Sequence, residues 1–337
     1  MALATLNIPG INWTGVRNAA TRELAVRVDG AWMDALKTKD PAQWWGQMVM
    51  MVPTDPETES TRLVLDLEDL GEYQEDTGTK AAPEPPPLQS LLVPRKPWKK
   101  ERSIRSRDLK LNRFGDYPDR LSSMLLASRR MPGAIVREMI YQAATNLKTY
   151  QGIPLIGSGH YVDPNDVSLG TFPNLHTGSA FSIANWRTAK KTVKKRRGPG
   201  DYPLDLSINL VLGGTDMEEH FDKVFKRTIV LDETGTTGVT NINSTMFEDG
   251  VIPVITSHLD NHPWLVANPN KHQWWTISTS YRARPFGVLA ENMGAPTVAV
   301  LDIGSEHEIK NESIYIISRM AMNGCAAYPQ TIDEWRE

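Results

Sequence analysis

The stretch GDYPDRLSSMLLASRRMPGAIVREMIYQAATN, residues 115–146, is the longest helical pattern in a chain of 337 residues. Apolar or small side chains recur near helical spacing and would share one face: Leu121, Leu125, Ser128, Ile135, Met139 and Ala143. Pro118 suits the first turn of a helix, whereas Pro132–Gly133 in the middle predicts a kink or a split into two rods. The stretch therefore predicts a rod whose apolar stripe needs a partner.

The C-terminal part of the chain offers that partner. Its segments QWWTISTSYRARPFGVLAEN (273–292), APTVAVLDIG (295–304) and ESIYIISRMAMNGCAAYP (312–329) read as successive strands with no long helix between them. We expect the stripe to pack against Ile314, Ile316 and Met320, because neither element can bury its apolar face alone. Strands that are segregated from helices in this way predict an α+β fold.

Residues 181–262 lie between the rod and the last strands and read as a unit of their own. FSIANWRTAKKTVKK (181–195) predicts a helix, and LDLSINLVLGG (204–214) predicts a strand. Thr215 and Glu218 form a capping-box pattern at the start of a second helix, and VIPVITSHL (251–259) predicts a second strand. We expect this α/β unit to be an insertion that could fold by itself.

The first helix of this unit ends in AKKTVKKRRGPGD, residues 189–201, with six basic side chains in eight positions: Lys190, Lys191, Lys194, Lys195, Arg196 and Arg197. Such a run can grip phosphates, or it can be a solvated helix end. Lys plus Arg is 37 against 40 for Asp plus Glu, a net charge of −3, so the chain lacks the basic balance of a dedicated nucleic-acid binder. Cations in a last helical turn also face the negative end of the helix dipole. We therefore interpret the run as a helix end with an exposed loop, and nucleic-acid contact as the less favoured alternative.

Charge is also segregated in the N-terminal third. Residues 55–76 contain nine acidic residues and one basic residue, whereas residues 95–110 contain eight basic residues and two acidic ones. The segment KAAPEPPPLQSLLVPRKP (80–97) lies between them and predicts an extended, exposed excursion, since its prolines exclude a helix or a central strand. It is either a solvated loop or an arm with two limbs that are complementary to copies of itself. The second reading makes these residues candidate contacts between subunits: Asp66, Glu68, Asp69, Arg102, Arg105 and Arg107.

Catalytic motifs are weak throughout the sequence. A phosphate-binding loop is absent, and the only cysteine, Cys325, excludes a cysteine-based zinc cluster or an internal disulfide. HLDNH places His258, Asp260 and His262 at alternate positions that would share a strand face and could bind a metal, although a polar turn explains them better. His160 is interpreted as a hydrogen-bonding loop residue. We predict no catalytic residue, no cofactor and no metal. With no signal peptide or bilayer-spanning stretch in the sequence, we also expect a soluble protein that is made in a cytoplasm.

The order of these elements resembles the major capsid proteins of tailed phages, of the Hong Kong 97 type, and is most similar to the major head subunit of Mu-like phages. The junction before the rod carries the resemblance through Arg107, Asp108, Gly115 and Tyr117, and TYQGIPLIGSGHYVDP (149–164) carries it through His160. The first C-terminal strands (274–292) carry the resemblance through Trp274, Ser280, Arg282, Pro285 and Phe286. NGCAAY (323–328) stands at the position of a further motif of the family. The aromatic pair of the second motif is missing here, and the proline-rich segment departs from the family.

The resemblance implies four parts: an N-terminal arm (1–58), an extended loop (59–112), a peripheral domain (113–180 and 263–337) and an axial domain (181–262). It implies a structural, non-enzymatic subunit that forms hexamers and pentamers of an icosahedral shell around double-stranded DNA, which it contacts without reading sequence. The expected partners are copies of the chain itself and portal, scaffold or decoration proteins, with no membrane. The expected location is the virion, after assembly in the host cytoplasm. The alternatives are an encapsulin-like nanocompartment shell protein and a metal-dependent nucleic-acid enzyme that uses HLDNH.

Overall fold

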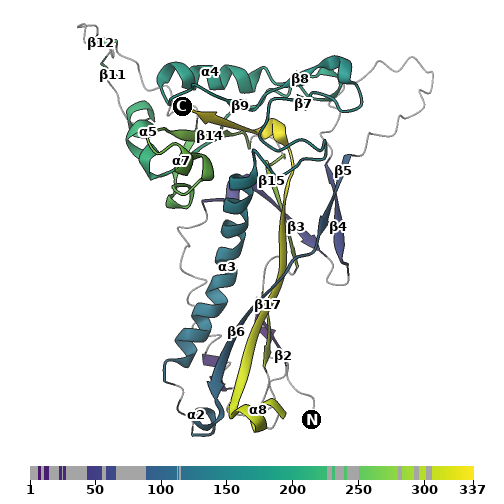
Figure 1. Ribbon diagram of the computed structural model, residues 1–337, viewed down its shortest axis with the longest axis vertical. Coiled ribbons are helices and arrows are strands. Elements are labelled where there is room, and N and C mark those ends of the chain that lie inside the picture. Colours follow the sequence, from purple (N-terminus) through teal and green to yellow (C-terminus); the bar gives the residue numbers. More distant parts are fainter. Residues whose placement is uncertain are drawn as a thin grey trace, which may run out of the picture.

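The chain folds into a long limb that carries a wider unit at one end (Figure 1). The computed structural model describes residues 7–8, 11–14, 23–24, 26–27, 44–54, 58–65, 89–111, 113, 115–225, 230–231, 239–240, 250–279, 283–291, 296–300 and 306–337. We call the limb the helix α3 (Tyr117–Gln142) with β17 (Ser313–Ala326) and the strands of its sheet. We call the wider unit the crown, which is a second sheet with α4 (Ile183–Lys194), α5 (Glu218–Phe225) and α7 (Pro263–Ala267).

Helix α3 is the predicted rod. Its stripe is confirmed, because Leu121, Leu125, Ile135 and Met139 are all buried. The helix is not split at Pro132, which lies inside one continuous element and is itself buried. Gly133 allows Trp45 to lie against the helix, since a Cβ at this position would come within 2.9 Å of the Trp45 ring.

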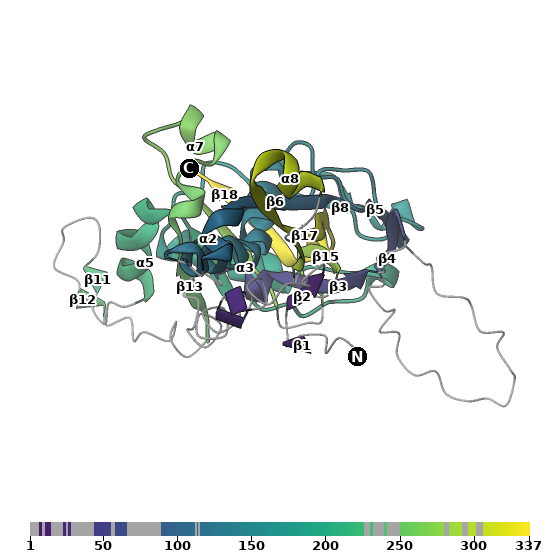
Figure 2. The ribbon, with the colours of Figure 1, turned by 90° about the horizontal axis from the view of Figure 1, so that it is seen from below.

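The limb sheet has seven strands. Their order is β1-β2-β16-β17-β15-β3, with β6 (Pro97–Arg105) on the other side of β17. Figure 2 looks along the limb and shows β6 on one side of β17 and β2 and β3 on the other. β6 pairs antiparallel with β17 over nine positions, from Arg105 opposite Ser313 to Pro97 opposite Ala321. The remaining bounds are β1 Asn7–Ile8, β2 Ile11–Thr14, β3 Val49–Thr54, β15 Phe286–Glu291 and β16 Thr297–Val300.

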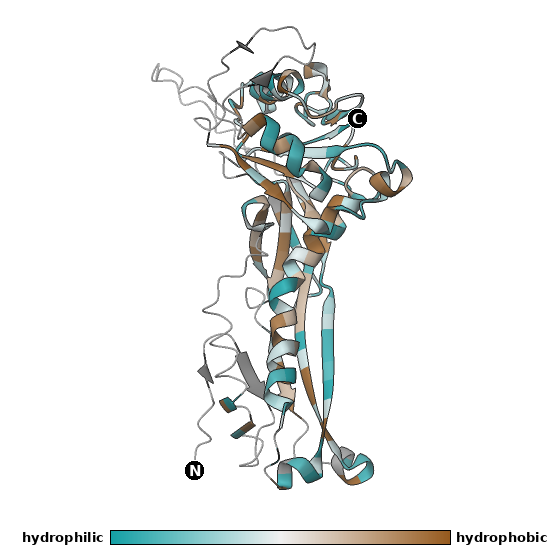
Figure 3. Cartoon of the chain, turned by 90° about the vertical axis from the view of Figure 1, so that its left-hand side faces the viewer, coloured by the Kyte–Doolittle hydropathy of each residue, from teal (hydrophilic) through white to brown (hydrophobic). Residues whose placement is uncertain are grey.

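The predicted contact between the rod and the last strands is confirmed. Leu121 and Leu125 of α3 share one hydrophobic cluster with Ile314 and Ile316 of β17, and Met320 packs against a second cluster that contains Ile135 and Met139. Leu24 also joins the first cluster. In Figure 3 the hydrophobic residues lie where α3 faces the sheet, while β6 is hydrophilic along most of its length.

The crown sheet is assembled from strands far apart in the sequence. Its order is β13-β10-β14-β18-β9, with β13 and β10 parallel. Two of these strands, β14 (Gln273–Ile277) and β18 (Ile332–Arg336), lie beyond residue 262, and they carry Trp274 and Trp335 into the crown's hydrophobic cluster. A fragment of 181–262 would lack both strands, so the expectation that this insertion could fold by itself does not fit the sheet. The other bounds are β9 Leu175–His176, β10 Leu210–Gly213 and β13 Ile252–Ile255.

Two local predictions in the crown need correction. The predicted strand 204–214 is a strand only at Leu210–Gly213, although Leu206 and Ile208 are buried. The predicted capping box is wrong, because the Asp260 carboxylate accepts from the Thr215 amide at 2.7 Å and from its hydroxyl at 2.9 Å. A carboxylate from elsewhere in the chain thus satisfies this helix start.

Short elements complete the fold. These are α2 (Ser106–Lys110) and α8 (Glu306–Asn311) at the far end of the limb, the hairpin of β4 (Ser60–Leu65) and β5 (Gln89–Pro94), and the pairs β7 (His160–Tyr161) with β8 (Thr171–Phe172) and β11 (Val230–Leu231) with β12 (Val239–Thr240). Within the described ranges, no helix combines the length and apolar character that a bilayer crossing requires.

Candidate assembly surfaces

Strand β6 gives the limb a free sheet edge. Among the described strands it pairs only with β17, so its other edge presents backbone N–H and C=O groups without strand partners. Its outward residues are polar or charged, and Lys99, Lys100, Glu101 and Arg102 are all exposed. Charged side chains on an edge strand discourage indiscriminate pairing with other chains. The edge is therefore suited to a partner that is selected by charge.

The predicted basic contact residues lie on this edge and just beyond it. Arg102 and Arg105 belong to β6 and Arg107 to α2, and all three are exposed. No carboxylate of the described residues forms an ion pair with any of them. The structure thus places residues 97–105 in the limb sheet, whereas the sequence had suggested a limb of an exposed excursion. The acidic candidates Asp66, Glu68 and Asp69 lie outside the described residues, so the contact between the two groups stays a prediction.

The β4–β5 hairpin is fixed to the limb by its base. Its two strands pair in register from Ser60 opposite Pro94 to Leu65 opposite Gln89. Leu63, Leu65 and Val93 are buried in a cluster with Leu289 of β15. The hairpin projects sideways from the limb near the crown (Figure 1). The hairpin is thus packed onto β15 of the limb sheet.

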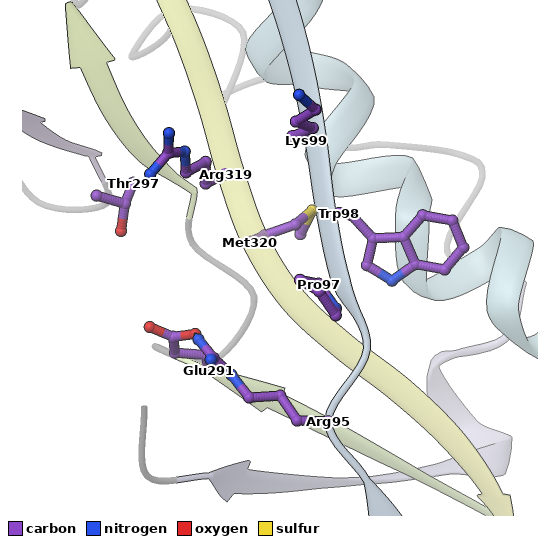
Figure 4. A pocket seen from close by; sticks show the side chains of 8 residues that line it. All are labelled: Arg95, Pro97, Trp98, Lys99, Glu291, Thr297, Arg319 and Met320. Carbon is purple, nitrogen blue, oxygen red and sulfur yellow. The ribbon is translucent and has the colours of Figure 1, made fainter. Parts of the chain in front are cut away.

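A charged cavity opens beside β17, between β6 on one side and the strands β15 and β16 on the other (Figure 4). It has a volume of about 540 Å³ and is lined by Arg95, Pro97, Trp98, Lys99, Glu291, Thr297, Arg319 and Met320. Arg95 Nη2 lies 2.5 Å from Glu291 Oε2, and Lys99 Nζ lies 3.0 Å from Glu101 Oε1. Arg319 extends toward Thr297 and has no carboxylate partner among the described residues. An arginine in this position can take a carboxylate of another chain, because the guanidinium group binds carboxylates in a bidentate manner.

One arginine of the basic run 189–201, Arg196, is buried inside the crown. The Arg196 side chain is 2% exposed, and its Nη2 lies 2.6 Å from Asp333 Oδ1 while its Nη1 donates to the Gln330 carbonyl at 2.6 Å. His176 Nε2 lies 3.1 Å from the same Asp333 oxygen, and the Arg196 guanidinium lies over the Phe172 ring. Arg197, its exposed neighbour, pairs with Asp201. The interpretation of the whole run as an exposed helix end is therefore wrong for Arg196, which ties α4 to β18.

The HLDNH segment forms a turn and a helix cap, so the alternative of a shared strand face is wrong. His258 and Leu259 lie in a 3-10 turn, and Asp260 accepts from Thr215. His262 caps α7, with Nδ1 accepting from the Trp264 amide at 3.2 Å and Nε2 3.4 Å from the Ile140 carbonyl oxygen. Burial lowers the pKa of His262 to about 4. Across the residues that the structure describes, no three His, Cys, Asp or Glu side chains are grouped to hold a metal.

His160 has a structural setting that agrees with its interpretation as a hydrogen-bonding residue. It is fully buried, its Nε2 lies 3.1 Å from the Leu155 carbonyl oxygen, and its ring stacks on Phe172. Burial lowers the pKa of His160 to about 4, so the ring is neutral near pH 7. Because the ring is buried, it is not placed to act as a base on an external substrate.

Comparisons with known proteins found likeness in structure alone. No protein-family model and no curated protein matches this sequence. A chain of the bacteriophage JBD30 procapsid is similar with a TM-score of 0.51 and 14% identity, and the match covers 96% of this chain and 76% of that one. A chain of the bacteriophage PhiM1 mature capsid has a TM-score of 0.49 at 12% identity, covering 86% of this chain and 85% of that one. An encapsulin from Synechococcus elongatus PCC 7942 has 0.45 at 10% identity, covering 95% of each chain.

The fold is the Hong Kong 97-type capsid fold. This agreement confirms the α+β architecture predicted from the sequence. At 14% sequence identity, the similarity shows the fold alone.

The junction that carried the resemblance has a physical role in this capsid fold. The Tyr117 hydroxyl donates to Asp108 Oδ2 at 2.8 Å, which joins α2 to the first turn of α3. Gly115 lies between them with φ of 47°, a left-handed conformation that glycine adopts without strain. Burial, followed by the hydrogen bond to Asp108, raises the pKa of Tyr117. Three of the residues quoted for the resemblance thus build one turn at the start of the long helix.

Proposed function

We propose that this chain is the major head subunit of a tailed, Mu-like phage or prophage, which self-assembles into hexamers and pentamers of an icosahedral shell around double-stranded DNA. The observation that carries the proposal is the agreement with the bacteriophage JBD30 procapsid chain over 96% of this chain, at a TM-score of 0.51. The subunit would be structural and without catalytic activity. It would reside in the virion, after assembly in the host cytoplasm.

The surfaces of the limb support this role. Identical subunits in a closed shell need surfaces that are complementary but not identical, and charge complementarity fixes their register. The exposed Arg102, Arg105 and Arg107 supply positive charge along β6 and just beyond it, and the cavity around Arg319 supplies a further arginine on the limb. The acidic residues Asp66, Glu68 and Asp69 of another copy would supply the negative one. Portal, scaffold or decoration proteins would be further partners.

The four parts that the resemblance implies belong to this proposal. The hairpin of β4 and β5 would be the base of the extended loop, and the limb would be the peripheral domain. The crown would be the axial domain, enlarged beyond 181–262 by β14 and β18. The metal-dependent alternative has no support in the geometry, because His258, Asp260 and His262 serve the turn and the helix cap.

Sedimentation velocity of the expressed full-length protein tests the proposal. We expect capsomers or large particles of uniform size, and a protein that sediments only as a monomer would contradict a shell role. Particles purified from the native host would then be treated with nuclease. Protected double-stranded DNA supports the phage head, whereas a protein cargo without DNA would point to the nanocompartment alternative.

A further inference from the structure

Helix α4 carries a stripe of cations on a face beside the one that it buries in the crown's core. Trp186, Ala189 and Val193 are buried on the core face, whereas Arg187, Lys191 and Lys194 are exposed. The stripe lines a cavity of about 320 Å³ together with Ser207 and Ile208, and its members are Arg187, Lys190, Lys191 and Lys194. Their spacing of three and four residues brings them together on one face. The stripe is thus a single surface with four basic groups.

Three cations of the stripe, Arg187, Lys191 and Lys194, have no acidic partner among the described residues. The described residues that line the cavity include no carboxylate. Within the part of the chain that the structure describes, Arg187, Lys191 and Lys194 form no ion pair, whereas Arg196 and Arg197 in the same run each have an acidic partner. The basic residues therefore differ in role. Arg196 and Arg197 pair with acidic residues of the crown, whereas Arg187, Lys191 and Lys194 have no acidic partner among the described residues.

The chemistry of the cavity favours a phosphate backbone over a protein partner. Contacts between proteins depend on buried aromatic or other large anchors at the centre of the interface. Among its described lining residues, this cavity offers one hydroxyl and one aliphatic side chain besides its cations. Non-specific binding of DNA needs only cations that neutralise phosphates. The stripe runs for about 10 Å along the helix, a length over which one DNA strand presents about three phosphates.

We propose that Arg187, Lys191 and Lys194 bind the phosphodiester backbone of double-stranded DNA, without contact to base edges. The proposal rests on the proposed function, in which the shell encloses DNA, and it adds the surface of the subunit that holds it. Phosphate contacts carry no sequence information, so duplexes of different sequence bind equally.

The test uses the full-length protein and two 30-base-pair duplexes of unrelated sequence, with binding measured by fluorescence anisotropy between 50 and 200 mM salt. The variant is Arg187→Gln, Lys191→Gln and Lys194→Gln together. The matched control is Arg120→Gln, Lys223→Gln and Lys310→Gln, which removes three exposed cations from other helices, each paired with an acid four residues earlier. Both triple variants lower the net charge by three, so a difference between them reports on position.

We expect the α4 variant to bind both duplexes about 10-fold or more weakly at low salt, with the slope of log affinity against log salt reduced by about 2 to 3. The control should bind as the wild type does. The inference is overturned if the wild type binds no duplex at 50 mM salt, or if both variants lose the same affinity. It is also overturned if the α4 variant keeps its DNA affinity but forms no shells, because the stripe is then a contact between copies. A wild type without shells contradicts the proposed function alone.

Discussion

The limb and the crown bury their cores in different ways. The core of the limb is aliphatic, with Leu121, Leu125, Ile314 and Ile316 from two distant segments packed between one helix and one sheet. The crown's core is rich in aromatic rings, including a Trp274–Trp335 stack with centroids 5.0 Å apart. The crown also buries an ion pair, Arg196 with Asp333.

The difference indicates which part of the subunit has surface left for other copies. In the limb, Tyr315 and Ile317 on the sheet face away from α3 are only half-buried and Arg319 is exposed, while β6 has one strand partner among the described residues. In the crown, polar groups such as Arg196 and Asp333 find their partners within the chain. The crown also shares a hydrophobic cluster with the limb, so the surface that other copies can cover lies mainly on the limb.

The largest expected effect is on the core of the limb. Leu125→Asp would bury a carboxylate without a partner in a site that is 1% exposed. The penalty of about 5 kcal/mol or more approaches the stability of a whole domain, so we expect no soluble subunit. Ser123→Asp on the exposed side of the same helix is the control and should give a normal yield. Soluble yield and thermal unfolding measure both variants, and normal assembly of Leu125→Asp would refute a shared core.

A smaller effect is expected in the crown. Arg196→Ala leaves Asp333 buried and unpaired, which costs about 3–5 kcal/mol for a broken buried ion pair. Arg197→Ala, one residue along, removes an exposed pair with Asp201 and should change stability little. Chemical denaturation compares the two, and equal effects would mean that the buried network does not hold α4 to β18.

The junction of the two regions predicts a dependence on pH. His262 lies between Ile140 of the limb and Trp275 of the crown, and burial lowers its pKa to about 4. The unfolded chain, with a pKa of about 6.5, then binds more protons between pH 6.5 and 4, so stability is complete above pH 6.5 and falls as the pH drops to 4. The loss is about 3 kcal/mol at most for this residue.

His160 should contribute a similar loss, since burial lowers its pKa to about 4 as well. His262→Gln should therefore make the slope of unfolding free energy against pH shallower in this window. An unchanged slope in His262→Gln would show that His262 is not buried neutral.

The limb was the more predictable region, because its signal is local. The spacing of Leu121, Leu125, Ile135 and Met139 predicts a buried face wherever the partner comes from. The continuity of α3 at Pro132 was not predictable, since the sequence does not show what surrounds this turn, where Trp45 from another part of the chain lies against Gly133. The place of β6 in the sheet was hidden for the same reason, because its partner β17 lies more than 200 residues away.

The crown shows the limit of reading charge from a sequence. Lys194, Lys195, Arg196 and Arg197 look alike in the run, yet only Arg196 is buried. Its partner Asp333 is 137 residues further on, and its burial follows from the pairing of β18 with β14. A charged residue in a strand with apolar neighbours, such as Asp333 near Ile332 and Trp335, can indicate a buried ion pair. It does not indicate which basic residue is the partner.

The smallest effect on stability is expected at the free edge. Reversing Arg102, Arg105 and Arg107 to Glu should leave a folded subunit, because all three are exposed, but it should block assembly by like-charge repulsion. The triple change to Lys keeps the charges and serves as the control, which should assemble. Sedimentation and circular dichroism separate the two outcomes, and unfolding of the Glu variant would place these residues in the subunit's own core.

Electron cryomicroscopy of the assembled full-length protein tests the central claim, that the limb is completed by other copies. We predict closed icosahedral shells in which neighbouring copies cover the free edge of β6 and the limb face around Tyr315, Ile317 and Arg319. Shells in which this edge and face remain open to solvent, or a protein that forms no shells, would contradict the account.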